Sequence, residues 1–435
     1  MHEALIETST PASAAGHPSS DDVWLVEPAR LEGVVELSGA KNSALRLLAA
    51  SLLTPGTVEL TNYPESLLDA RVHVAMLEAL GKRCTVSAGR IVIEEERALS
   101  SKLEYTGRAI RNNLLIWGAL TARTGCAAVP LPGGCRLGER KYDLHVHLLE
   151  KLGARVWEEN GLLCAEAPNG LVGCDVHLAL RSTGATENGI LCGCLARGRT
   201  RIWNPHIRPE ILDLVDFLRE LGARITVRGQ ESIVIDGPTE FTGGSHRVVP
   251  DNMEGLTWMI AAFVTGGDLE IRGFPTTHLE VPLIHLRESG ARYFTSGDRV
   301  IARASSIYPV EISTGPYPGI NSDMQPLFAV YGACARGGSR IVDLRFPGRY
   351  AYADELAKMG LRKREEGNFL AIEGGAPLYG ADVDAIDLRA GAALLLAGCV
   401  ATGTTRIRNA WQIERGYDHV LAKLAAVGAR VHKSK

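Results

Sequence analysis

Residues 129–142 read VPLPGGCRLGERKY, a stretch that places a thiol among basic side chains. Cys135 follows two glycines and is itself followed by Arg136, Arg140 and Lys141. Glycines let the backbone turn sharply and approach a ligand closely, and nearby cations raise the thiolate fraction of a cysteine. This stretch is therefore predicted to be an anion-binding loop with a reactive thiol.

The other cysteines have a simpler explanation as packing residues. The chain has nine cysteines and no CxxC pair, so neither a disulfide framework nor a zinc site is expected. Five of them lie in apolar runs and are expected to be buried: Cys164, Cys192, Cys194, Cys334 and Cys399.

Polar residues also gather where six apolar helices are expected to begin. An Asp at a helix start is explained equally well by N-capping, and that alternative is open for Asp323 and Asp387. Capping does not explain Lys41, Arg111 or Arg389, because a cation at a helix N-terminus opposes the helix dipole. These cations predict an anion that is held by them and by the free N–H groups of the helix.

A further set of arginines lies in the loops that follow the first strand of each repeat. Three of these loops carry Arg140, either Arg345 or Arg349, and Arg415. Equivalent positions of pseudo-symmetric units can meet at one point. Arginines that meet without matching carboxylates predict a bound polyanion, such as a phosphate together with a carboxylate.

The elements that position these residues repeat six times. Each repeat contains a helix that is apolar nearly all round, which predicts burial on every side. It also contains an amphipathic helix that ends in a glycine and is followed by a strand. The closing phrases are LEALGKR, LEKLGAR, LRELGAR, LRESGAR, LAKMGLR and LAAVGAR, and their glycines are Gly81, Gly153, Gly222, Gly290, Gly360 and Gly428.

Each unit is thus predicted to be an inner helix, a strand, a loop, an outer helix and a strand. Six such α/β units are too many for one hydrophobic core, so two domains of three units each are expected. Residues 1–22 read as a disordered leader and residues 41–249 as the first domain. Residues 23–40 join residues 250–435 in the second domain, because the segment VWLVEP needs a sheet and is expected to pair with the last unit.

Composition limits the classes of function. The 435 residues are 46% hydrophobic and 22% charged with a net charge of -3, which gives no indication of nucleic-acid binding. No apolar run reaches the roughly 18–20 residues of a membrane span. The N-terminus lacks the basic and apolar regions of a secretory signal. We therefore expect a cytoplasmic protein with small-molecule partners, as a monomer or weak homo-oligomer.

Six motifs together resemble one family. They are LxGxVxLSGAKNSAL (31–45), LPGGCRLGERKYDLH (131–145), STGATEN (182–188), SDMQ (322–325), DLRAGAALLLAG (387–398) and IERGYD (413–418). With them the chain resembles the enolpyruvyl transferases, and most closely their UDP-N-acetylglucosamine 1-carboxyvinyltransferase branch, from about residue 24 to 432. The resemblance implies a fold of six α/β units in two inside-out barrel domains, with the active site between them.

The resemblance also implies an addition–elimination reaction. The acceptor hydroxyl attacks C2 of phosphoenolpyruvate while C3 is protonated, and phosphate then leaves. Cys135 would be the general acid, with the capacity to add covalently to phosphoenolpyruvate. Asp323 would take the acceptor proton. The phosphoenolpyruvate anion would be held by Lys41, Arg140, Arg389 and Arg415, so that neither a metal ion nor a cofactor is implied.

The acceptor would be a uridine nucleotide. Residues that the resemblance assigns to it are Asn42, Arg111, Asp143, Ser182, Thr183, Gly184, Asp323 and Asp387. Three stretches depart from the family pattern: FPGRYAY stands for FENRFMH, KYDLH for PVDLH and RNNLL for RASIL. These departures lie where the acceptor is expected to bind, whereas the phosphoenolpyruvate residues are intact.

The acceptor therefore stays open between two nucleotides. UDP-N-acetylglucosamine, for peptidoglycan synthesis, is favoured. The alternative is the 3′-hydroxyl of UMP, as in nucleoside-antibiotic assembly, with Lys141 at the terminal phosphate. A third reading is a non-catalytic protein that binds phosphoenolpyruvate or a nucleotide. The intact Cys135 and Asp323 argue against it.

Overall fold

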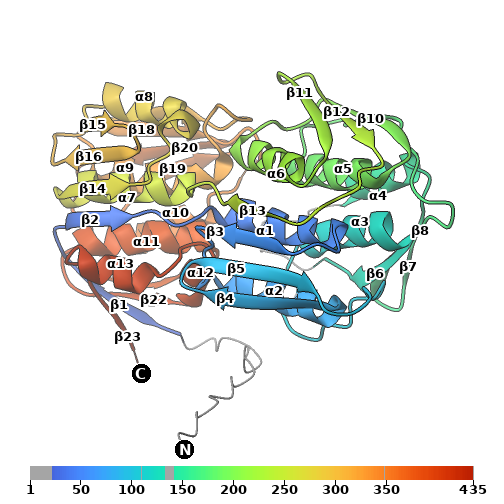
Figure 1. The fold of residues 1–435 in the computed structure, drawn as a ribbon. Helices are drawn as coiled ribbons and strands as arrows, with labels where there is room; N and C mark the ends of the chain where they lie inside the picture. Colours follow the sequence, from blue (N-terminus) through green and yellow to red (C-terminus); the bar gives the residue numbers. More distant parts are fainter. Residues whose placement is uncertain (1–21, 109, 133–141, 347, 435) are drawn as a thin grey trace, which may run out of the picture.

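The computed structural model describes residues 22–108, 110–132, 142–346 and 348–434 (Figure 1). Residues 1–21 of the predicted leader, Cys135 and Arg140 lie outside these residues. Among the described residues, no helix is both long and apolar enough to cross a membrane. Within the same ranges, no group of acidic, histidine and cysteine side chains has the arrangement of a metal site.

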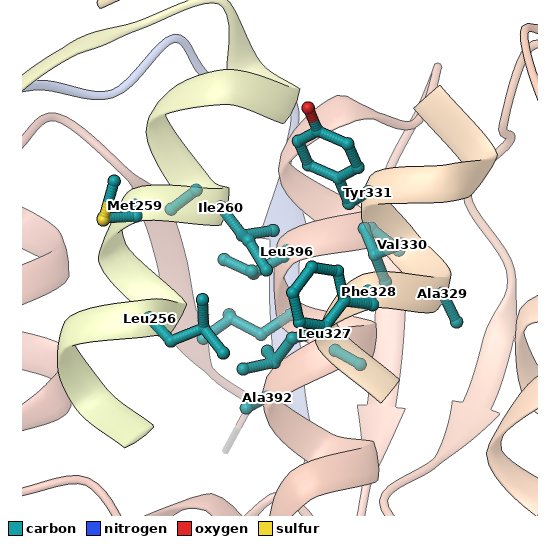
Figure 2. Close-up of a cluster of buried hydrophobic side chains, with 14 of the residues drawn as sticks. Leu256, Met259, Ile260, Leu327, Phe328, Ala329, Val330, Tyr331, Ala392 and Leu396 are labelled. Carbon is teal, nitrogen blue, oxygen red and sulfur yellow. The ribbon is translucent and has the colours of Figure 1, made fainter. Parts of the chain in front are cut away.

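Six helices are buried along nearly their whole length, as their apolar composition predicts. In α7 and α11 every residue apart from the ends is buried. Figure 2 shows how three of these helices meet, with Leu256 and Ile260 of α7, Phe328 of α9 and Leu396 of α11 packed together. The inner helices are α1 (Lys41–Ala50), α3 (Asn113–Thr124), α5 (Thr183–Leu195), α7 (Asn252–Thr265), α9 (Gln325–Cys334) and α11 (Leu388–Val400).

The outer helices bury one face only. In α6, Ile211, Leu214, Phe217 and Leu218 are buried, whereas Leu212, Asp216 and Arg219 are exposed. The glycine of each repeat phrase has a positive φ, between 83° and 118°, which is the left-handed conformation that ends a helix without strain. The outer helices are α2 (Leu68–Leu80), α4 (Asp143–Lys151), α6 (Pro209–Glu220), α8 (Glu280–Glu288), α10 (Ala351–Lys358) and α13 (Val420–Ala426).

The strands differ from the prediction in number. In five of the six units the outer helix is followed by an antiparallel hairpin of two strands, where the sequence predicted one. The hairpins are β4–β5 (Lys82–Ser87, Arg90–Glu95), β7–β8 (Arg155–Glu159, Leu162–Glu166), β11–β12 (Arg224–Arg228, Ser232–Gly237), β15–β16 (Arg292–Ser296, Arg299–Arg303) and β19–β20 (Arg362–Glu366, Phe369–Glu373).

Each hairpin pairs with the strand that follows the inner helix of the same unit. In the five units with a hairpin these strands are β3 (Val58–Thr61), β6 (Cys126–Pro130), β10 (Gly198–Trp203), β14 (Asp268–Arg272) and β18 (Gly338–Val342). The corresponding strand of the sixth unit is β22 (Thr405–Arg408). A short parallel strand from a different unit completes four of the sheets: β9 (Asp175–His177), β13 (Gly244–Arg247), β17 (Glu311–Ser313) and β21 (Asp382–Asp384).

The N-terminal segment supplies one strand to the sheet of the sixth unit and one to the sheet of the fourth unit. The sixth unit has a single strand after its outer helix, β23 (Arg430–Lys433). β1 (Trp24–Glu27) inserts between β22 and β23, as the apolar segment VWLVEP predicted. β2 (Glu32–Glu36) pairs in parallel with β14 of the fourth unit. Residues from the start of the chain are therefore structurally part of the sheets formed by units four and six (Figure 1).

The hydrophobic core falls into two clusters. One contains residues between Ala44 and Val248, and the other joins residues 24–37 to residues 253–427. The chain crosses between these halves twice, and the two crossings pair with each other. Gly39 and Pro250 form an antiparallel bridge, with Ala40 N donating to Val249 O at 2.7 Å. We refer to residues 41–249 as the first half and to residues 22–40 with 250–434 as the second half.

Two buried histidines of the first half predict an acid-sensitive fold. Asn112 Nδ2 donates to Nδ1 of His73 at 3.0 Å, and Asn188 Nδ2 donates to Nδ1 of His145 at 3.1 Å. A protonated ring could not accept these bonds. Burial lowers the pKa of each ring from 6.5 to about 3. Because the unfolded chain binds these protons first, stability is present above pH 6.5 and is lost as the pH falls towards 3.

We expect the free energy of unfolding to fall by about 1.4 kcal/mol per pH unit for each of these histidines. Chemical denaturation between pH 7 and pH 4 measures this slope. His73→Gln should reduce the slope, and His432→Gln, at an exposed position, should leave it unchanged. An equal slope in all three proteins would contradict the assignment.

Candidate active site

A buried cluster of three charges joins the two halves. Lys41 is the first residue of α1, and its Nζ lies 2.7 Å from Oδ2 of Asp69, in the first turn of α2. Arg415 belongs to the second half and follows the short helix α12 (Trp411–Glu414). Its Nε and Nη2 donate to the two oxygens of Asp69 at 3.0 and 3.2 Å. The expectation that the converging arginines lack a carboxylate is therefore wrong for Arg415.

The shared carboxylate keeps its charge despite deep burial. Burial alone would raise the pKa of Asp69, but the charges of Lys41 and Arg415 outweigh it and hold this pKa well below its ordinary value. Burial lowers the pKa of Lys41, and the attraction of Asp69 opposes that shift. Two cations of the cluster therefore share this one carboxylate.

Arg389 lies in the first turn of α11 and is almost completely buried, with 2% of its surface exposed. Among the residues that the structure describes, its Nε and Nη1 have no hydrogen-bond partner, and its guanidinium lies over the ring of Tyr417 at 5.5 Å. The nearest carboxylate contact is Asp323 Oδ2, at 3.8 Å from Nε. A buried guanidinium with unused donors requires an acceptor, and a bound anion would supply it.

Asp323 lies at the edge of the same region, in the 3-10 helix η3 (Ser322–Met324), with 31% of its side chain exposed. Its Oδ1 accepts a bond of 2.7 Å from Nη1 of Arg349. The same nitrogen donates to Ser322 Oγ at 3.1 Å, and Nη2 lies 3.8 Å from Asp387 Oδ2. Of the two arginines that the sequence left open in this loop, Arg349 therefore faces Asp323.

The structure separates the capping residues from the others. Asn321, not Asp323, caps η3, because Asn321 Oδ1 accepts from Asp323 N at 3.1 Å. The capping explanation holds for Asp387, whose Oδ1 accepts from the backbone of Arg389 and Ala390 at 2.7 and 2.8 Å. Asp387 therefore fixes the start of α11 and with it the direction of Arg389. The Asp323 carboxylate does not cap η3 and instead lies beside Arg349 and Arg389.

Sequence reasoning missed a second buried carboxylate, Asp343, directly after β18. It has no exposed surface and accepts from Thr314 Oγ1 at 2.7 Å and Ser322 Oγ at 2.6 Å. The backbone N–H groups of Arg345 and Phe346 also donate to it. Asp343 thus ties the loop that carries Arg349 to η3 and supports the Arg349–Asp323 pair.

The residues assigned to an acceptor surround the start of α5. Ser182 Oγ caps this helix by accepting from Ala185 N at 3.3 Å. Thr183 Oγ1 lies 2.8 Å from Nδ1 of His206. At Gly184 a Cβ atom would come within 2.9 Å of the His145 ring, so a larger residue would collide.

The other predicted acceptor residues are placed at three separate helix starts. Asn42 is the second residue of α1, and its Oδ1 accepts from Nη1 of Arg46 at 3.4 Å. Arg111 stands in the turn before α3, and Asp143 is exposed as the first residue of α4. The structure thus gathers Lys41 and Arg415 around one carboxylate. Asn42, Arg111 and Asp143 lie apart from one another, at the starts of α1, α3 and α4.

A family model matches residues 25–424, and its description is EPSP synthase (3-phosphoshikimate 1-carboxyvinyltransferase). The chain belongs to this family. It is an enolpyruvyl transferase, also called a carboxyvinyltransferase, as the SGAKN and PGGC motifs indicated.

Relatives that are named for their activity align with nearly the whole chain. One from Carboxydothermus hydrogenoformans, named UDP-N-acetylglucosamine 1-carboxyvinyltransferase 2, is 40% identical over 93% of this chain and 97% of its own. A protein of the same name from Mesorhizobium japonicum is 38% identical over 95% of this chain and 99% of its own.

Solved structures support the same α/β fold. The enolpyruvyl transferase NikO from Streptomyces tendae aligns with a TM-score of 0.86 at 26% identity, over 95% of this chain and 99% of its own. EPSP synthase from Acinetobacter baumannii aligns with a TM-score of 0.73 at 18% identity, over 95% of this chain and 100% of its own, which shows the shared fold alone.

Proposed function

We propose that the enzyme transfers the enolpyruvyl group of phosphoenolpyruvate to a hydroxyl of UDP-N-acetylglucosamine and releases phosphate. The observation that carries this proposal is the buried guanidinium of Arg389, whose unused donors lie beside Asp323. An anionic substrate would complete its hydrogen bonds within reach of a carboxylate that can take a proton. The names of the relatives supply the acceptor and imply a step of peptidoglycan synthesis.

In the addition step, Asp323 accepts the proton of the acceptor hydroxyl, and the hydroxyl oxygen forms a bond to C2 of phosphoenolpyruvate. The electron pair of the double bond takes a proton at C3 from Cys135. In the elimination step the Cys135 thiolate takes a proton back from C3, the double bond re-forms, and the C2–O bond to phosphate breaks. Its electron pair leaves on phosphate, which takes the proton held by Asp323. Lys41, Arg140, Arg389 and Arg415 stabilise the charge on phosphate and carboxylate.

The remaining acceptor residues have roles that follow from their places. Ser182, Thr183 and Gly184 present the N-terminus of α5 to the nucleotide, and the free N–H groups there suit a phosphate. Asn42, Arg111 and Asp143 would line the rest of the acceptor pocket. Because both substrates are metabolites of the cytoplasm, we place the reaction in that compartment.

We further propose that the two halves act as domains, with boundaries at residues 41–249 and at residues 23–40 with 250–435, each an inside-out α/β barrel. The two core clusters and the paired crossings at Gly39 and Pro250 support this division. Closure of the domains would bring Arg389 and Asp323 of one half towards the acceptor residues at the start of α5 in the other half. It would also exclude water from the reacting atoms.

The role of Cys135 is tested by substitution. Cys135→Ala is expected to lower kcat by about 10²–10⁴-fold, because it removes the acid that protonates C3. Binding of UDP-N-acetylglucosamine, followed by calorimetry, should survive. Full turnover in this variant would refute the assignment.

Alkylation provides an independent check. The described buried thiols should be inert, since burial raises the pKa of Cys192 to about 12, but Cys126 is exposed and would also react. In a Cys126→Ser background, one equivalent of a thiol reagent should label Cys135 and stop turnover. Inactivation with the label on another cysteine would count against Cys135.

The choice of acceptor is tested by competition. The FPGRYAY stretch replaces two polar side chains of the family pattern next to Arg349, which keeps UMP as the second candidate. An equimolar mixture of UDP-N-acetylglucosamine and UMP should give mainly the enolpyruvyl nucleotide sugar by mass spectrometry. Enolpyruvyl-UMP as the main product would move the enzyme to the alternative acceptor and leave the proposed chemistry intact.

A further inference from the structure

His206 makes a hydrogen-bonded bridge between the two halves. It follows β10 in the first half, and its Nδ1 lies 2.8 Å from Oγ1 of Thr183 at the start of α5. On the other side of the ring, the backbone N–H of Tyr317 donates to Nε2 at 3.3 Å. Tyr317 belongs to the second half, where its hydroxyl donates to Thr277 O. The imidazole of His206 thus contacts both the predicted acceptor residue Thr183 and the opposite half of the chain.

The direction of both bonds follows from the neutral ring. Nε2 accepts from an N–H group, so Nδ1 carries the proton and donates to Thr183 Oγ1. Burial, together with the charges of Arg208 and Arg345, lowers the pKa of His206 to about 4. The ring is therefore neutral at pH 7 and can accept the bond from Tyr317. Arg181 adds a further positive charge, and Glu210, which is paired with Arg208, opposes the shift.

The bridge is firmly attached at its first-half end. The backbone N–H of His206 donates to Thr186 Oγ1 at 3.0 Å, and Thr186 Oγ1 donates to Ser182 O at 2.8 Å. Thr183 Oγ1 accepts from His206, so its own proton is available to an acceptor atom of a ligand. Within the described ranges no protein acceptor for that proton is recorded. A phosphate oxygen at the N-terminus of α5 would take it and strengthen the bond from His206.

The second-half end of the bridge leads directly to Asp323. Tyr317 is at the tip of a loop that is closed at its base by the bond from Gly315 N to Ile320 O at 2.8 Å. Asn321 follows that base and holds Asp323 N at 3.1 Å. The loop is also joined to the buried Asp343 through Thr314 Oγ1. A displacement of Tyr317 therefore moves the segment that carries Asp323.

We propose that His206 is a positioning residue that couples acceptor binding at Thr183 in the first half to the placement of Asp323 in the second half. The inference rests on the proposed function. In it, the bound nucleotide positions the general base, Asp323, through the contacts of His206. In such a linkage the nucleotide and phosphoenolpyruvate must favour each other's binding by the same factor.

The coupling is measured by calorimetry of phosphoenolpyruvate binding with and without UDP-N-acetylglucosamine, in a Cys135→Ala background in which turnover is expected to be slowed by about 10²–10⁴-fold. With His206 present, the nucleotide should raise the affinity for phosphoenolpyruvate by at least about fivefold. His206→Asn retains a donor near Thr183 but cannot reach Tyr317. The longer side chain of His206→Gln can still accept from the N–H of Tyr317 but no longer donates to Thr183 Oγ1. Each variant should bring the factor below about two, with the affinity for phosphoenolpyruvate alone unchanged.

Tyr317→Phe is the matched control, because it retains the backbone N–H and should retain the coupling. Full coupling in either histidine variant would overturn the proposal, and one folded variant suffices for this test. In enzyme with Cys135 intact, the histidine variants should lose kcat more than they raise the KM for phosphoenolpyruvate. A wild type that releases no phosphate would contradict the proposed function, whereas normal turnover with full coupling in the variants would contradict the role of His206 alone.

Discussion

Asp323→Asn is expected to lower kcat by about 10²–10⁴-fold, the range that general-base catalysis contributes. The substitution preserves the size of the side chain, and the amide can still accept the bond from Arg349. It removes the negative charge that takes the proton of the acceptor hydroxyl. Because Asp343 and Ser322 still hold the loop, we expect the fold and the nucleotide affinity to be retained.

A nearby surface carboxylate gives the control. Asp354→Asn, on α10, removes an exposed carboxylate that pairs with Lys363 of β19, and it should leave kcat within twofold. Stopped-time assays of phosphate release at saturating substrates measure both variants. An Asp323→Asn enzyme with more than about a tenth of the wild-type kcat would remove Asp323 from the role of base.

Asp69→Asn is expected to lower the free energy of unfolding by about 3–5 kcal/mol, the cost of leaving buried charges without their partner. The substitution removes the carboxylate that Lys41 and Arg415 share in this buried site. An added anion can take the place of the lost charge. Inorganic phosphate should therefore stabilise the variant more than the wild type, and the difference should decrease with ionic strength.

The matched control for Asp69 is Asp236, whose pair with Arg199 is exposed on both sides. Asp236→Asn should change stability by less than about 1 kcal/mol and should show no extra response to phosphate. Urea denaturation with and without phosphate distinguishes the cases. If Asp69→Asn were as stable as the wild type, or were indifferent to phosphate, the account of the charge cluster would be wrong.

The repeat and its helices were predictable because each depends on local sequence. The apolar inner helices and the glycines that close the outer helices follow from residue type and spacing alone. The place of VWLVEP was also predictable, since an apolar strand needs partners. The second strand of each hairpin was missed, although turns such as Ala88–Gly89, with positive φ at both residues, separate the two strands in the sequence.

The charge partners of the site could not be found in this way. Asp69 reads as an ordinary acidic residue in the first turn of a helix, and its partner Arg415 is 346 residues away. Asp343 follows a strand like many loop residues. Place in the repeat does not distinguish Arg349 from Arg345, although only Arg349 matches the arginine of the family pattern FENRFMH. Such contacts are created by the meeting of distant units, so only the folded arrangement reveals them.

The most direct test of the central claim is the release of phosphate from phosphoenolpyruvate by the wild-type enzyme, with UDP-N-acetylglucosamine and without an acceptor. We predict release only when the nucleotide sugar is present, with one enolpyruvyl nucleotide sugar formed for each phosphate. Failure to release phosphate with this acceptor, or release at the same rate in its absence, would contradict the account.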